Sequence, residues 1–183
     1  MLLDQLNVTR QQIEQQIVEN IEHRILQEPS LLDSRLLLLW DDSWDPSVLG
    51  IAASRLSRKY NRPVILLSCR DENAIGSGRS INSVNIYDAL EHSSSLLEKF
   101  GGHAFASGLT IKQPNLPKLK QVLADHFESV YQPDDFKKKM TIDAVISLDD
   151  ITYDLACEIN RLRPFGVANP EPVFLSENIQ VVS

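Results

Sequence analysis

Two apolar runs with an amphipathic segment between them most strongly limit the folds available to this chain. Residues 35–40 form a continuous apolar run bounded by charged residues, as expected for a central strand buried on both faces. Asp45 and Pro46 suit the N-cap and first position of a helix that ends before residues 61–63. Residues 63–68 form a second buried run. A strand, a helix and a strand in this order predict a βαβ unit with a parallel strand pair.

The rest of the chain alternates between helix and strand patterns. Apolar residues spaced by four and seven predict one long helix over residues 4–27. Further elements are expected as a strand at 74–80 that breaks at its glycines, a helix at 86–100, a strand at 104–111 and a helix at 115–131. We therefore predict an α/β fold with a mixed, mostly parallel sheet flanked by helices. A long connector helix precedes it and a partial β-rich segment follows.

A polar, charged segment at residues 133–139 is the expected domain boundary. It separates a connector helix (1–29) and an α/β domain (30–132) from a linker and β-rich segment (133–183). That segment shows a strand at 141–147, a helix at 152–162 and a strand near 173–182, which make half of a β-barrel at best. The pattern stops within the last strand, so we expect both ends of the chain to be cut points in a longer protein.

Composition excludes some classes of protein but does not identify a single one. With 43% hydrophobic and 23% charged residues, the 183-residue chain is typical of a soluble globular protein. No apolar run is long enough to span a bilayer and no secretory signal is visible, so we predict a cytoplasmic protein. Cys69 and Cys157 lack metal-ligand spacing and are expected to be reduced and buried. The net charge of −7 excludes a wholly basic nucleic-acid binder, but it allows a local basic patch.

Two glycine-rich segments, residues 76–80 and 101–104, predict an anion site. Glycine lets the backbone approach a ligand closely, and arginine, serine and histidine are side chains that hold phosphate or carboxylate. We expect both segments to form turns that face each other across the intervening helix, with Arg79 and His103 as the main contacts. The alternatives are a β-bulge or tight turn with a surface arginine, and a histidine with a purely structural role. The spacing of a P-loop is absent, as is that of a zinc or two-metal site.

A second basic cluster lies on the helix that follows the first strand. Arg55, Arg58, Lys59 and Arg62 either form an ordinary solvated face or, if Arg55 turns toward Arg79, extend a track for successive phosphates.

Four motifs together resemble the RecJ family of single-strand-specific 5′-to-3′ DNA exonucleases. The segments at 44–56, 76–81 and 96–109 are similar to that family's DHH-associated domain, and the segment at 162–174 is similar to its entry into an oligonucleotide-binding (OB) barrel. The likeness covers nearly the whole chain in order. In two places the chain departs from the family pattern: Asp45 stands where a histidine is usual and would repel phosphate, and Ala168 replaces a usual glycine.

The resemblance implies that this chain is the nucleic-acid-binding part of an exonuclease acting in DNA repair and recombination. The family's catalytic DHH domain, which binds Mn²⁺ or Mg²⁺, is missing here and becomes an expected partner together with single-stranded DNA. No catalytic or metal-binding residue is therefore assigned to this chain. The residues expected to bind the substrate phosphate are Ser77, Gly78, Arg79, Ser80, Gly101, Gly102, His103 and Arg55.

Two other functions stay open at this point. One is a stand-alone interaction or regulatory module that keeps the fold but has lost DNA binding, which Asp45 and the negative net charge favour. The other is a binding site for short oligonucleotides or cyclic dinucleotides, which related DHH phosphoesterases bind with the same Gly-Gly-His segment.

Overall fold

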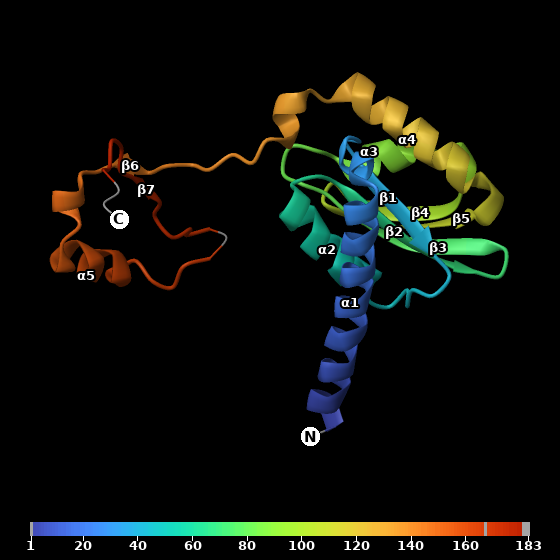
Figure 1. Ribbon diagram of the computed structural model, residues 1–183, viewed down its shortest axis with the longest axis horizontal. Coiled ribbons are helices and arrows are strands. Elements are labelled where there is room, and N and C mark those ends of the chain that lie inside the picture. Colours follow the sequence, from blue (N-terminus) through green and yellow to red (C-terminus); the bar gives the residue numbers. More distant parts are fainter. Residues whose placement is uncertain (1, 167, 181–183) are drawn as a thin grey trace. The chain divides into compact units, whose positions relative to one another are not determined.

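The computed structural model describes residues 2–166 and 168–180 (Figure 1). The chain divides into two compact units, Met1–Lys137 and Lys138–Ser183.

Within the described ranges, the first unit is built on a five-stranded sheet in the order β1-β2-β3-β5-β4. Its strands are β1 (Leu37–Asp41), β2 (Val64–Arg70), β3 (Asn73–Arg79), β4 (Leu97–His103) and β5 (Ala106–Lys112). The expected βαβ unit is confirmed, since β1 and β2 are parallel and are joined by helix α2 (Leu49–Tyr60).

The prediction of a mostly parallel sheet was wrong. β3 pairs antiparallel with β2 and with β5, and β4 pairs antiparallel with β5. Only two residues connect β2 to β3 and β4 to β5. Connections this short make hairpins, whereas a parallel pair needs a long crossover such as α2.

Helices lie on both faces of the sheet (Figure 1). On one face, α2 and the C-terminal half of α1 (Leu2–Gln27) bury a core that includes Ile21, Leu49 and Leu66. On the other face, α3 (Ile86–His92) and α4 (Leu116–Val130) bury a second core that includes Leu90, Leu109 and Phe127. The long N-terminal helix is thus confirmed, and its second half packs into this unit. Short 3₁₀ turns follow α1, β5 and α4 as η1 (Pro29–Leu32), η3 (Gln113–Asn115) and η4 (Pro133–Phe136).

Two helix boundaries differ from the sequence prediction. Asp45 does not cap α2; its carboxylate accepts hydrogen bonds from the N–H (2.8 Å) and hydroxyl (2.7 Å) of Ser47, and α2 begins at Leu49. Asp45 can satisfy its oxygens within a local turn, and this competes with capping.

The expected helix at 86–100 ends at His92 and is followed by a 3₁₀ turn, η2 (Ser94–Leu96), and then β4. The three consecutive serines at 93–95 are a loop signal, because serine hydroxyls compete for backbone hydrogen bonds. The Ser93 hydroxyl, for example, donates to the carbonyl of Ala89 at 3.0 Å.

The glycines of β3 do not break the strand, contrary to expectation. β3 is paired on both sides, and its glycines serve close packing. A Cβ on Gly76 would lie 2.5 Å from the Leu66 carbonyl oxygen, and one on Gly78 would lie 2.7 Å from Cδ1 of Ile86.

The second unit has a small parallel pair, β6 (Ala144–Val145) and β7 (Phe174–Leu175), with η5 (Leu148–Asp150) and α5 (Tyr153–Arg161) between them. Thr152 caps α5 by accepting the Leu155 N–H at 3.2 Å. The predicted strands and helix are thus present, though the strands are shorter. The end of the last predicted strand lies outside the described residues.

Among the described residues, no helix is both long and apolar enough to cross a membrane. Both cysteines are free thiols; Cys69 is buried as expected, whereas Cys157 is exposed, which corrects that part of the prediction.

Candidate nucleic-acid interface

The two glycine-rich segments meet across a single strand. They form the ends of β3 and β4 instead of the predicted turns, and each pairs with β5. Ala106 of β5 lies opposite Arg79 on one side and opposite His103 on the other. Directly opposed residues in antiparallel strands project to the same side of the sheet. Arg79 and His103 therefore stand on the same face, with one strand between them.

We call the side of β3, β5 and β4 that carries these two residues the open face. Strand alternation places on it the residues Asn73, Ile75, Ser77, Arg79, Ala106, Gly108, Thr110, Lys112, Lys99, Gly101 and His103. In the described structure the core beneath α1 and α2 contains no residue of β4 or β5, so those helices leave this part of the sheet uncovered. Gly101, His103 and Gly108 are accordingly exposed.

The centre of the open face is a floor without side chains. Gly101 and Gly108 lie side by side in register, next to Ser77. A Cβ on Gly101 would meet no described atom within 4 Å, and one on Gly108 would have its nearest contact at 3.8 Å, the carbonyl oxygen of Gly76. Packing does not require glycine at either position. Their absence of side chains instead lets a ligand approach the backbone closely.

Arg79 forms one wall of this floor. Its guanidinium is half-buried against α2, and one nitrogen donates to the carbonyl oxygen of Gly78 at 2.8 Å. A Cβ on Gly50 would lie only 2.6 Å from the other terminal nitrogen and 3.5 Å from the Ser77 hydroxyl, so glycine at 50 makes room for both groups. None of the described carboxylates lies within ion-pair distance of Arg79.

Burial lowers the pKa of Arg79 from its ordinary value, yet an arginine side chain stays protonated at neutral pH. A partly desolvated cation without a counter-ion is a favourable site for an anion. The first turn of α2, at Leu49 and Gly50, adds backbone N–H groups that have no partner within the helix, and the positive end of the helix dipole.

His103 forms the opposite wall. Its Nδ1 accepts the N–H of Phe105 at 3.3 Å, and the ring packs edge-on against the exposed ring of Phe105. An Nδ1 that accepts a hydrogen bond places the proton of the neutral ring on Nε2. The exposed Nε2–H is then free to donate to a ligand oxygen. The site thus offers hydrogen-bond donors from two sides of a bare floor.

Three predicted site residues have other roles. Gly78 and Gly102 belong to the opposite face of the sheet. Gly102 has φ +139°, and a Cβ there would lie 2.3 Å from the Ala106 carbonyl oxygen, so the hairpin itself requires glycine. Ser80 fixes a loop by donating its hydroxyl hydrogen to the Val84 carbonyl at 2.7 Å. The structure therefore does not bring these three residues to the floor.

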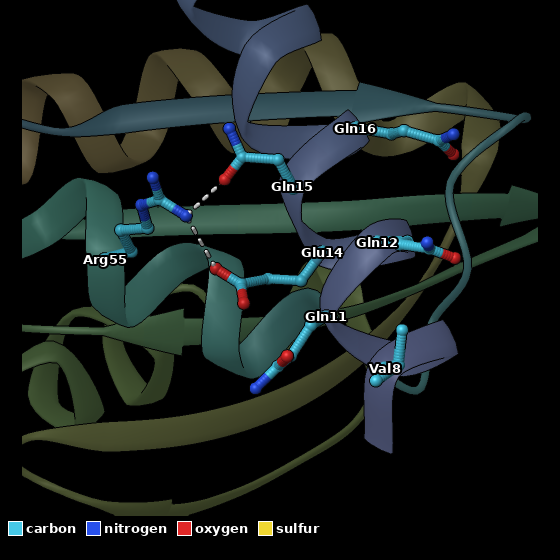
Figure 2. Close-up of a pocket in the computed structure, with 7 residues that line it drawn as sticks. All are labelled: Val8, Gln11, Gln12, Glu14, Gln15, Gln16 and Arg55. Carbon is cyan, nitrogen blue, oxygen red and sulfur yellow. Dashed lines mark hydrogen bonds and ion pairs between the residues drawn. The ribbon is translucent and has the colours of Figure 1, made fainter. Parts of the chain in front are cut away.

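Arg55 turns toward α1, where it points at Glu14 and Gln15 (Figure 2). Its guanidinium donates to Oε1 of Gln15 at 2.6 Å and lies 3.5 Å from a Glu14 carboxylate oxygen. Arg55 and Arg79 therefore form no common track in this structure, and the charge of Arg55 is partly neutralised.

The described residues contain no group of three or more histidine, cysteine, aspartate or glutamate side chains placed to hold a metal ion.

Comparison with known proteins agrees with this architecture. The family profile of the DHHA1 domain matches residues 31–129, and that of the RecJ OB domain matches residues 142–183. The chain therefore belongs to the DHHA1 domain family, and it joins a DHHA1 domain to a RecJ OB segment, the combination found in RecJ.

The single-stranded-DNA-specific exonuclease RecJ of Bacillus subtilis is 34% identical over 178 residues, which are 96% of this chain and 22% of that protein. RecJ of Thermus thermophilus in complex with Mn²⁺ is 26% identical with a TM-score of 0.79, over 95% of this chain and 25% of that one. The same protein in complex with Mg²⁺ gives 25% identity and a TM-score of 0.77, over 94% and 26%. The chain thus spans about a quarter of the length of these relatives.

Several members of the open face, among them Lys99, Thr110 and Lys112, were not singled out from the sequence. Lys99 was assigned to a helix that ends earlier, so its position on a strand was missed; the serines at 93–95 were the available signal. Thr110 shares its row.

Proposed function

We propose that this chain is the substrate-gripping part of a RecJ-like exonuclease and binds a phosphate of single-stranded DNA on the open face. The observation that carries the proposal is the in-register row of Arg79, Ala106 and His103 beside a floor of bare glycines. A phosphate on this floor would accept hydrogen bonds from Arg79 on one side and from Nε2–H of His103 on the other. Ser77 and the first turn of α2 complete the donor set.

The arrangement supports positioning of a phosphate. Arginine forms two parallel hydrogen bonds to phosphate oxygens, and a fixed orientation is what a hydrolytic centre needs from its binding groups. In the proposed whole enzyme, a metal-bearing DHH domain would supply the hydrolytic chemistry, and the present residues would hold and orient the strand. The names of the RecJ relatives, which specify single-stranded DNA, support the choice of substrate.

Replacement of Arg79 by alanine tests the proposal. We expect Arg79→Ala to weaken binding of a 5′-phosphorylated oligonucleotide by about 1–3 kcal/mol, as for other lost hydrogen bonds to charged groups. Fluorescence anisotropy measures the affinity, and thermal unfolding shows whether the variant is folded.

Arg55→Ala is the matched control. Because this arginine turns toward α1, we expect a change in affinity of no more than about twofold, the lower part of the range for an exposed charge. Equal affinity of the wild type and a folded Arg79→Ala variant would rule out the assignment.

A stand-alone interaction module is the second candidate, and one observation favours it. Asp45 precedes α2, the helix whose N-terminus adjoins the floor, and its Ser47 hydrogen bonds lower the pKa of the carboxyl, so it is ionised at neutral pH. A negative charge there opposes phosphate binding. An affinity that is weak and insensitive to salt would support this candidate, whereas a phosphate-gripping surface gives an affinity that falls steeply with salt.

A further inference from the structure

The open face continues past the phosphate site toward a second and a third basic side chain. Thr110 of β5 pairs with Ile75 on one side and with Lys99 on the other, and Lys112 pairs with Asn73. A register shift between Leu97 and Lys99 marks a β-bulge in β4. Leu97 packs against the core under α3 and α4, whereas Lys99 shares the open face with Gly101 and His103.

These rows follow one another at a regular interval. Residues two apart in a strand point to the same side and are separated by about 7 Å along the strand. His103, Gly101 and Lys99 therefore form a column along β4, which Lys112 of β5 extends by one further row. Lys99 and Lys112 are both exposed, and neither has an ion pair within the described part of the chain.

We propose that a single strand of nucleic acid lies lengthwise along β4 and β5, with its first phosphate between Arg79 and His103, its second over the glycine floor, its third at Lys99 and its fourth at Lys112. This inference rests on the proposed function of the open face and adds the path and extent of the bound strand. Charge complementarity and continuity with the phosphate site favour a nucleic-acid backbone as the occupant.

The chemistry between the basic residues suits the same occupant. The glycine floor lets a sugar-phosphate backbone lie close to the sheet, and Ile75, which is 45% exposed, offers an apolar contact to a sugar or base beside Thr110. Beyond the row of Lys112 the turn between β2 and β3 carries Asp71 and Glu72, two carboxylates that end the basic track. The track therefore spans four rows, about 20 Å, and takes about four nucleotides.

A length series of ligands tests the path in the 183-residue chain. Fluorescence anisotropy and competition would compare 5′-phosphorylated thymidine nucleotides of one, two and four residues, with wild type, Lys99→Gln and Lys112→Gln. Lys118→Gln is the matched control, because Lys118 is an exposed lysine on α4, which covers the opposite face of the sheet.

For Lys99→Gln we expect unchanged binding of the mononucleotide and a loss of about three- to fivefold for the tetranucleotide, the size of one exposed charge contact. The slope of log affinity against log salt for the tetranucleotide should fall by about 0.7, the value of one lost phosphate contact on a single strand. Lys112→Gln should show the same loss only with the tetranucleotide, and Lys118→Gln should show none.

Two results would overturn the path. One is a Lys99→Gln variant that binds the tetranucleotide as tightly as the wild type does, while Arg79→Ala binds it more weakly. That result would support the phosphate site but not the track. The other is an equal loss for all ligand lengths, or in Lys118→Gln as well, which would indicate only a general field effect. If Arg79→Ala also binds all ligands as tightly as the wild type does, the proposed function itself is wrong, and the path is wrong with it.

Discussion

The two faces of strands β3, β5 and β4 share one backbone but carry different side chains. The face under α3 and α4 carries Ala74, Leu109 and Ile111, all buried. The open face carries bare glycines between an arginine, a histidine and two lysines. A single alternating strand such as β5 thus serves both purposes: its odd-numbered residues hold the fold and its even-numbered residues are free for a ligand.

The largest expected contrast is in stability, between adjacent residues of β5. Leu109→Ala should lower the free energy of unfolding by about 2–5 kcal/mol, because it leaves a cavity in the core. Thr110→Ala on the open face should change it by less than about 0.5 kcal/mol. Urea denaturation of both variants measures the two values. Similar losses would show that the open face is also a packed surface.

A second contrast lies within the Gly101-Gly102 pair. Gly102→Ala should destabilise the protein by about 1–3 kcal/mol, since its backbone is at φ +139° and the new Cβ would contact the Ala106 carbonyl. Gly101→Ala has open space and should change stability by less than about 0.5 kcal/mol. Its methyl group should instead weaken binding of a phosphorylated oligonucleotide. Denaturation and anisotropy on both variants separate the roles, and a stable Gly102→Ala variant would contradict them.

The smallest expected effect is a pH dependence of stability, which arises on the side of the sheet that α3 and α4 cover. His126 of α4 has an Nε2 that is buried without a hydrogen-bond partner, and its ring lies 4.8 Å from that of His92 on α3. Burial, followed by the charge of His92, lowers the pKa of His126, while Asp88 opposes the shift. The folded protein therefore disfavours protonation. Its stability should be greatest above the ordinary histidine pKa of about 6.5 and should fall as the pH drops below it.

His126→Gln should flatten this pH dependence of stability between neutral and mildly acidic pH, as measured by denaturation at several pH values. His103→Gln, on the open face, should instead weaken oligonucleotide binding. A profile that keeps its slope in His126→Gln would assign the pH dependence to other groups.

The sequence alone predicted many of the local elements. The helices α1, α2 and α4 and the parallel pair β1–β2 follow from apolar periodicity, which depends only on neighbouring residues. Arg79 and His103 were recognised as candidates because their residue types, beside glycine, suit an anion. Those features can be predicted from residues that are neighbours in the sequence, without knowledge of the tertiary contacts.

The tertiary structure decided what local patterns leave open. Whether a glycine-rich segment is a turn or a strand depends on strands that pair with it from elsewhere, and β2 and β5 make β3 a strand. The direction in which Arg55 points depends on Gln15 of α1, forty residues away in the chain. Only the register of β3, β5 and β4 places Arg79, His103 and Lys99 on one face, because that register is fixed by long-range pairing and core packing.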